Sequence, residues 1–77
     1  MNTEKQRSVW DLKVGETSTI QSFANIDMAS KFLAVGIIPS AQLTMVRYSP
    51  FRSAVCIKLG DTYMALRNQE AKCILID

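Results

Sequence analysis

Apolar and polar residues alternate along five short runs of the sequence, which is the pattern of β-strands that bury one face. The runs cover residues 17–24, 41–48, 54–59, 62–67 and 73–76. Gly60 and Asp61 separate the third run from the fourth, and Gly at the first of two loop positions is typical of a type II′ hairpin. Because closure protects the edges of short strands, the pattern predicts a mainly β fold, a small closed or nearly closed five-stranded barrel.

Two of these runs depart from strict alternation. Ile20 and Phe23 are three positions apart, so either Phe23 faces outward or a β-bulge turns it back. In residues 41–48 the apolar side chains fall on both faces of the strand, and we expect Leu43 and Met45 on one face, Val46 and Tyr48 on the other. Such a two-sided pattern suits a strongly curved strand.

Residues 27–36 carry the helical pattern of the chain. Asp27 is a good N-cap, because its carboxylate accepts hydrogen bonds from the free amides of the first turn. A stripe at helical spacing is expected to pack against the sheet: Ala29, Phe32, Leu33 and Gly36. Gly36 also suits the position that ends a helix, and Pro39 cannot continue it. The helix therefore lies between the first and second predicted strands, and a short helical turn from Asn68 through Ala71 precedes the last strand.

The composition is that of one small globular domain. With 77 residues, 48% of them hydrophobic, the chain is too short for a second core and too apolar for disorder. We expect residues 1–7 to form a flexible polar tail and residues 8–77 to form a single domain. No apolar run suits a secretory signal or a membrane span, and the two thiols, Cys56 and Cys73, suit a reducing compartment. These features predict a cytoplasmic protein without direct membrane insertion.

Charge and residue chemistry exclude several classes of function. Nine Lys and Arg against seven Asp and Glu give a net charge of +2, too small to favour a nucleic-acid partner. Histidine is absent, and two cysteines on separate strands do not predict a metal site. The three glycines stand alone, so there is no glycine-rich phosphate loop, and nothing indicates acid–base catalysis. We therefore expect no enzyme, no cofactor, no catalytic residues and no metal ligands.

Five residues are candidates for contact with a partner protein. Pro50, Phe51 and Arg52 lie together in a loop, where Phe51 is either an exposed apolar anchor or a plug over the end of the barrel. Trp10 either covers the base of the barrel or is exposed. Met28, with Val35, lies off the edge of the helix stripe and is placed to reach a partner groove.

The order of these motifs resembles the FeoA family, the ferrous iron transport protein A domain. Residues 35–40, Val-Gly-Ile-Ile-Pro-Ser, are similar to the family signature at the end of the helix. Residues 49–51, Gly60 and residues 64–67, 70–71 and 74–76 match in the same order, so the resemblance spans residues 8–77. The family usually has Gly where this chain has Ser40, and because Ser disfavours positive φ we expect a type I turn there.

The resemblance implies an SH3-like barrel with an inserted helix. It also implies an accessory protein of bacterial ferrous iron uptake, which contacts FeoB, a membrane transporter with a cytoplasmic GTP-binding domain, and so resides at the inner face of the membrane. A further hypothesis is that this chain supplies an arginine to the GTP site of such a partner, where it stabilises charge on the phosphoryl group being transferred. Arg52 is the first candidate, and Arg47 and Arg67 are the others. Because a ligand set is missing, contact and control of another protein is the more natural role than carrying iron.

Other functions stay open from the sequence. A small β-barrel can bind single-stranded nucleic acid through basic and aromatic residues, for which the candidates are Arg47, Tyr48, Phe51, Arg52, Lys58 and Tyr63. An iron-sensing domain related to the C-terminal domain of iron-dependent repressors, with direct binding of Fe²⁺ through carboxylates, is another alternative. A weak homo-oligomer is also left open.

Overall fold

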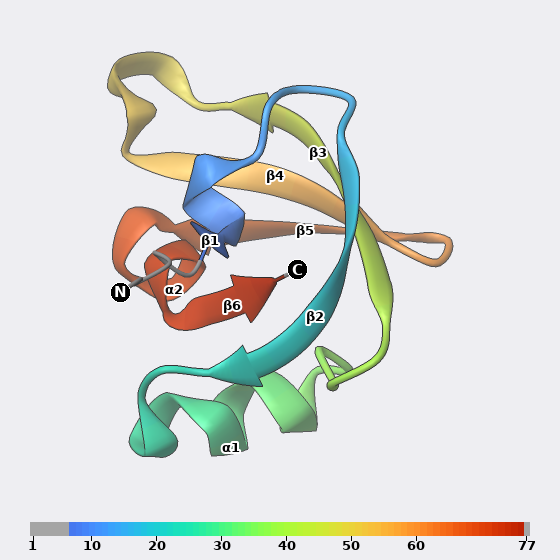
Figure 1. Cartoon of the computed structure of the whole chain (residues 1–77). Helices are drawn as coiled ribbons and strands as arrows, with labels where there is room; N and C mark the ends of the chain where they lie inside the picture. Colours follow the sequence, from blue (N-terminus) through green and yellow to red (C-terminus); the bar gives the residue numbers. More distant parts are fainter. Residues whose placement is uncertain (1–6, 77) are drawn as a thin grey trace, which may run out of the picture.

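The computed structural model describes residues 7–76, whose strands form one open antiparallel sheet in the order β1-β6-β2-β3-β4-β5 (Figure 1). The strands are β1 (Arg7–Ser8), β2 (Thr17–Phe23), β3 (Gln42–Tyr48), β4 (Ala54–Leu59), β5 (Thr62–Arg67) and β6 (Ile74–Ile76). The helices are η1 (Val9–Asp11), α1 (Ile26–Ala34), η2 (Pro50–Arg52) and α2 (Asn68–Cys73), of which η1 and η2 are short 3₁₀ turns. The predicted mainly β class is confirmed.

The predicted strand count of five is wrong, because Arg7 and Ser8 form an additional two-residue strand. Arg7 pairs with Ile76 and Ser8 with Leu75, so β1 adds to the outer edge of β6. A strand this short has no alternation of its own and is defined only by its partner. The long helix consequently lies between the second and third strands rather than the first and second. Of the expected tail, residues 1–6 lie outside the described residues, whereas Arg7 belongs to β1.

The sheet is open rather than closed, with β1 and β5 at its two edges in the described part of the chain. β2 joins its two halves, since the start of β2 pairs with β3 and the end pairs with β6. A register shift between Ile20 and Ser22 turns Phe23 inward, where its ring lies 5.2 Å from that of Phe32. The bulge alternative for Phe23 is therefore the correct one.

A second register shift lies in β3, between Met45 and Arg47. Beyond it, Tyr48 pairs with the buried Val55 and packs against the core. The expectation that Tyr48 points away from Leu43 and Met45 is wrong, because the bulge returns the strand to the core face one residue out of phase.

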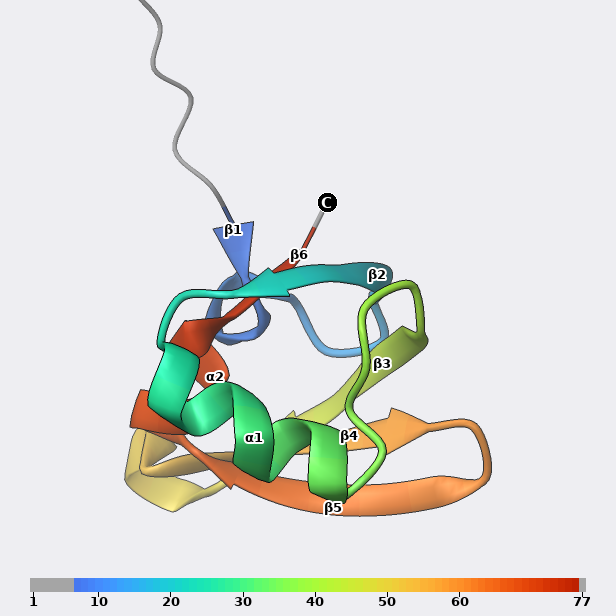
Figure 2. The ribbon, with the colours of Figure 1, turned by 90° about the horizontal axis from the view of Figure 1, so that it is seen from below.

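Helix α1 begins one residue before the predicted start. Its N-cap is Asn25, not Asp27, and the Asn25 side chain accepts hydrogen bonds from the amides of Asp27 at 2.9 Å and Met28 at 3.3 Å. Phe32 is buried as predicted, but Leu33 is 50% exposed. The helix packs through a narrower stripe than expected, because it covers the open side of the sheet between β2 and β5 (Figure 2) rather than lying flat upon it.

Helix α2 extends the predicted single turn by two residues, to Cys73. Its first turn is stabilised by Glu70, whose carboxylate accepts the amide hydrogen bond of Arg67 at 2.8 Å. Ala71 is fully buried, so α2 closes one end of the core. The core residues come from every strand except β1: Val9, Leu12, Ile20, Phe32, Ile37, Leu43, Met45, Val55, Ile57, Leu66, Ala71, Ile74 and Ile76. Within residues 7–76, no helix is both long and apolar enough to span a membrane.

The turn at Ser40 differs from the expected type I turn. Ser40 has φ +81°, in the left-handed region that favours Gly, and its amide donates to the carbonyl oxygen of Ile20 at 2.8 Å. That hydrogen bond ties the turn to β2 and holds Ser40 in the left-handed conformation that its side chain disfavours. Gly36 has φ +94°, as predicted for the residue that ends the helix.

We predict that Ser40→Gly raises the free energy of unfolding by about 1 kcal/mol, because Gly relieves the strain at positive φ while the backbone hydrogen bond remains. Urea unfolding followed by circular dichroism measures the change. Ser30→Gly, at an exposed site inside α1, serves as the control and should lower the free energy by about 0.5 kcal/mol. A loss of stability in Ser40→Gly would contradict the strain argument.

We also predict an acid-sensitive contribution from Glu16. The carboxylate of Glu16 accepts a hydrogen bond from the backbone amide of Lys13 at 3.0 Å and another from the guanidinium group of Arg7 at 2.9 Å. Both bonds lower the pKa of Glu16 from its ordinary value of 4.5, and the bond from Lys13 has the larger effect. A carboxyl group whose pKa is lower in the folded state stabilises the fold at every pH above its unfolded-state pKa. This stabilisation is lost as the pH falls through the folded-state pKa. Glu16→Gln should therefore flatten the decline of Tm between about pH 6 and pH 3, and Asp61→Asn should not.

Candidate functional site

The loop between β3 and β4 presents Phe51 to solvent. The Phe51 side chain is 100% exposed, and both Phe51 (φ +64°) and Arg52 (φ +55°) adopt left-handed backbone conformations. Ser49 joins the two ends of the loop, since its hydroxyl accepts a hydrogen bond from the amide of Ala54 at 2.8 Å and lies 3.1 Å from the hydroxyl of Ser53. Of the two alternatives for Phe51, the plug is wrong because the side chain is fully exposed, and contact of Phe51 with a partner stays a prediction.

Arg52 folds back onto two aromatic rings, although the residue remains exposed. Its guanidinium carbon lies 4.1 Å from the ring centre of Tyr48 and 5.1 Å from that of Trp10. The two rings meet edge to face at 5.6 Å, and the Lys72 amine lies 5.6 Å from the Trp10 ring. Trp10 is thus half-buried and covers one end of the sheet. Its ring lies near two cations, Arg52 of η2 and Lys72 of α2. The stack holds Arg52 in place beside the exposed Phe51.

Tyr48 links this stack to the start of the chain. Its hydroxyl donates to the carbonyl oxygen of Leu12 at 2.5 Å and lies 3.0 Å from that of Trp10. The inward turn of β3 after the bulge is what brings the hydroxyl to η1 and the residue that follows it. The loop, the stack and η1 therefore form one connected unit.

The helix edge supplies a separate apolar groove. Met28 is half-buried and packs against the core, so it is less accessible than the sequence suggested, whereas Val35 is 56% exposed. A groove of about 380 Å³ runs between α1 and β5 and is lined by Lys31, Phe32, Val35, Ile37, Met64, Ala65, Leu66 and Glu70. Met28 and Val35 are thus not equivalent, and neither lies in the loop that carries Phe51.

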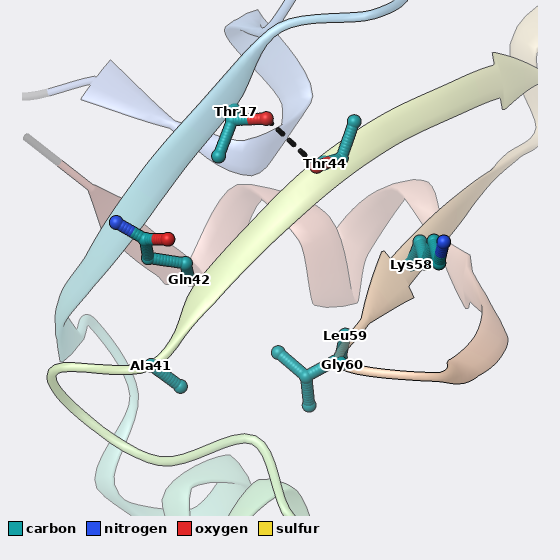
Figure 3. A pocket seen from close by; sticks show the side chains of 7 residues that line it. All are labelled: Thr17, Ala41, Gln42, Thr44, Lys58, Leu59 and Gly60. Atoms are coloured by element: carbon teal, nitrogen blue, oxygen red, sulfur yellow. Dashed lines mark hydrogen bonds between the residues drawn. The ribbon is translucent and has the colours of Figure 1, made fainter.

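Cationic side chains gather on the side of the sheet that faces away from the core. We call this side the outer sheet face and define it by Thr44, Arg47, Cys56, Lys58, Ala65 and Arg67. Figure 3 shows the hollow at one end of it, where the hydroxyl groups of Thr17 and Thr44 are 2.7 Å apart and Lys58 flanks them. Sequence reasoning missed this face, because the β3 bulge places Arg47 level with Cys56.

The proposed nucleic-acid residues do not form one surface. Arg47, Lys58 and Tyr63 lie on the side of the outer sheet face, whereas Tyr48 points to the core and Arg52 stacks upon it. The Lys58 amine also lies 5.7 Å from the centre of the Tyr63 ring. The two exposed rings, Phe51 before the start of β4 and Tyr63 near its end, do not form the continuous stacking platform that single strands need.

The described residues do not fit a metal ion of the kind that transition-metal proteins hold. Within residues 7–76 there is no group of three or more His, Cys, Asp or Glu side chains placed to share an ion. Cys56 and Cys73 are both half-buried free thiols, one on β4 and one at the end of α2.

Comparison with solved structures shows that the fold of this chain is shared with FeoA proteins and with part of a transcriptional repressor. A FeoA-like protein from Clostridium acetobutylicum matches with a TM-score of 0.86 at 17% identity, over 97% of this chain and 88% of that chain. A zinc complex of Stenotrophomonas maltophilia FeoA, described as a prokaryotic SH3 domain protein, has a TM-score of 0.80 at 21% identity, over 92% and 89%. A manganese-dependent transcriptional repressor in complex with manganese has a TM-score of 0.83 at 20% identity, over 97% of this chain but 37% of its own.

The sequence comparison is more specific than the fold. The FeoA domain family matches residues 8–77, and no curated protein gives a significant match. The chain therefore belongs to the FeoA domain family, as its motifs suggested, and the family is associated with ferrous iron transport.

We predict that Tyr48→Phe lowers the free energy of unfolding by about 1–2 kcal/mol, because the Leu12 carbonyl oxygen loses its donor in a half-buried setting. Urea unfolding provides the measurement. Tyr63→Phe removes an equivalent hydroxyl from an exposed ring and should change the free energy by less than about 0.5 kcal/mol. Equal effects of the two substitutions would show that the Tyr48 hydroxyl does not hold η1 to the sheet.

Proposed function

We propose that this protein is a small accessory protein of bacterial ferrous iron uptake that acts by contact with a FeoB-type membrane transporter. The contact is made with the cytoplasmic GTP-binding portion of that transporter, so the protein works in the cytoplasm at the inner face of the membrane. It regulates its partner and catalyses no reaction of its own. Membership of the FeoA domain family supports a role in ferrous iron uptake. The loop around Phe51 supports action through contact with a partner protein.

The observation that carries the proposal is the conformation of Phe51. A bulky apolar side chain that is fully exposed, on a backbone with φ +64°, gains nothing for the isolated fold. Both features become favourable when an apolar pocket of a partner buries the ring, since aromatic and Arg side chains dominate binding energy at interfaces. Pro50 restricts the loop before Phe51, and the Arg52 stack restricts it afterwards, which reduces the entropy lost on binding.

The arrangement of Arg52 favours a binding role over a catalytic one. Its guanidinium group lies against Tyr48 and Trp10 of its own chain, so an arginine supplied in trans would first have to leave both rings. We therefore assign Arg52 to holding the loop and assign Phe51 to the contact. A relative from Stenotrophomonas maltophilia is described as a suggested ferrous iron transport activating factor, which agrees in kind with a regulatory role.

We predict that Phe51→Gly separates stability from binding. Because Gly accepts positive φ, the free energy of unfolding should stay unchanged or rise by up to about 1 kcal/mol. Affinity for the cytoplasmic portion of the transporter should fall at least about tenfold, because the apolar anchor is gone. Isothermal titration calorimetry with that portion, nucleotide-free and with GDP or a GTP analogue, measures the affinity.

Ile26→Ala is the matched control for this experiment. Ile26 is 83% exposed on α1, so its truncation removes a comparable apolar group from a different surface. It should change the affinity by less than about twofold. If the unaltered chain binds the transporter portion in none of these nucleotide states, the proposed function is wrong.

A further inference from the structure

The outer sheet face concentrates positive charge that the modest net charge of the chain conceals. Arg47, Lys58 and Arg67 lie on three adjacent strands and all three side chains are exposed. In the register of the sheet, Lys58 is level with Thr44, Arg47 with Cys56, and Arg67 with Ala54. Because same-face residues repeat about every 7 Å along a strand, the three cations occupy successive rows of the face.

Within residues 7–76, no carboxylate forms an ion pair with Arg47, Lys58 or Arg67, although the Glu70 carboxylate accepts the backbone amide hydrogen bond of Arg67. The acidic residues of the described chain all lie elsewhere, in η1, before β2, on α1, at the β4–β5 turn and on α2: Asp11, Glu16, Asp27, Asp61 and Glu70. Over residues 7–76 the one ion pair joins Arg7 and Glu16. Arg47 and Lys58 thus carry positive charge that no ion pair within residues 7–76 offsets, and this charge favours an anionic partner.

Two hollows give the face a shape as well as a charge. The hollow beside Lys58 has a volume of about 610 Å³ and presents the hydroxyl groups of Thr17 and Thr44 and the amide of Gln42 (Figure 3). The hollow beside Arg47 has a volume of about 200 Å³, and its floor includes Ala54, Cys56 and Ala65. Each hollow thus pairs a cation with room for a side chain.

We propose that the outer sheet face docks an extended acidic segment of a partner protein. Residues at alternate positions of an extended segment are also about 7 Å apart, so Asp or Glu at those positions match the rows of cations. Carboxylates would receive hydrogen bonds from Lys58 and from the Thr and Gln side chains in the first hollow, and a small apolar residue would fill the second. Pro50 borders the second hollow, so the same partner can bury Phe51.

Two other anionic partners fit the face less well. A lipid surface is smooth and leaves both hollows unfilled. Single-stranded nucleic acid stacks successive bases on neighbouring aromatic rings, whereas the two exposed rings, Tyr63 level with Lys58 and Phe51 in the loop before Ala54, lie at opposite ends of β4. A protein segment satisfies the charge, the spacing and the hollows together.

The test is an NMR titration of the ¹⁵N-labelled full chain with a peptide of about eight residues that alternates Glu and Ser. The expected result is a set of shifts on amides of the outer sheet face, including Thr44, Cys56 and Ala65, which weaken as NaCl rises from about 50 to about 300 mM. The same peptide with Gln in place of Glu should cause no shifts. Equal shifts with both peptides, or shifts confined to other surfaces, would overturn the proposal.

Two double variants with the same net charge separate a local site from a general charge effect. Arg47→Glu with Lys58→Glu should weaken binding of the Glu peptide at least about tenfold. Lys13→Glu with Lys31→Glu, both exposed and away from this face, should weaken it less than about threefold. An equal loss in the two double variants would overturn the proposal, as would binding to phosphatidylserine vesicles or to oligo(dT) in place of the peptide.

The proposal rests on the function proposed above, because both require a protein partner, but the two can fail separately. If the transporter portion binds Arg47→Glu with Lys58→Glu as tightly as the unaltered chain while Phe51→Gly loses binding, the acidic-segment proposal is wrong and the proposed function stands. If the unaltered chain binds the Glu peptide but not the transporter portion, the proposed function fails and the chemistry of the face stands.

Discussion

The bulge in β3 is the constraint on which both functional surfaces depend. By placing one additional residue between Met45 and Tyr48, it changes which side of the strand each later residue occupies. Tyr48 turns to the core and binds the segment after η1, and Arg47 turns to the outer sheet face. Without the bulge, Tyr48 would lie on the outside and the support beneath Arg52 would be missing.

That support explains how a loop with two strained residues persists. Left-handed conformations at Phe51 and Arg52 cost about 1–2 kcal/mol each, and the protein offsets this through hydrogen bonds at Ser49 and the packing of Arg52 against the rings of Tyr48 and Trp10. Phe51 itself contributes none of the offset, since it is fully exposed. The strain is concentrated where the chain presents its most accessible apolar group, which is consistent with a surface kept for binding.

Sequence patterns predicted the features that depend on local physics. Alternation located β2 to β5 closely, and Gly36 ended the helix as its left-handed preference requires. The predicted start of the helix was wrong because two nearby residues can both serve as N-cap, and Asn25 rather than Asp27 caps α1. The predicted type I turn at Ser40 was wrong because a hydrogen bond to β2, formed between distant parts of the sequence, outweighs the local preference of Ser for negative φ.

Taken alone, the sequence determined the mainly β class, the helix, the family and the loop that carries Phe51, since each follows from residue type and spacing. Tertiary structure decided the sixth strand, the open sheet, the exposure of Phe51 and the gathering of Arg47, Lys58 and Arg67 on one face. These features depend on strand partners far apart in the chain and on one residue of register. A one-residue shift moves a side chain to the opposite face, and the sequence of a single strand does not specify that register.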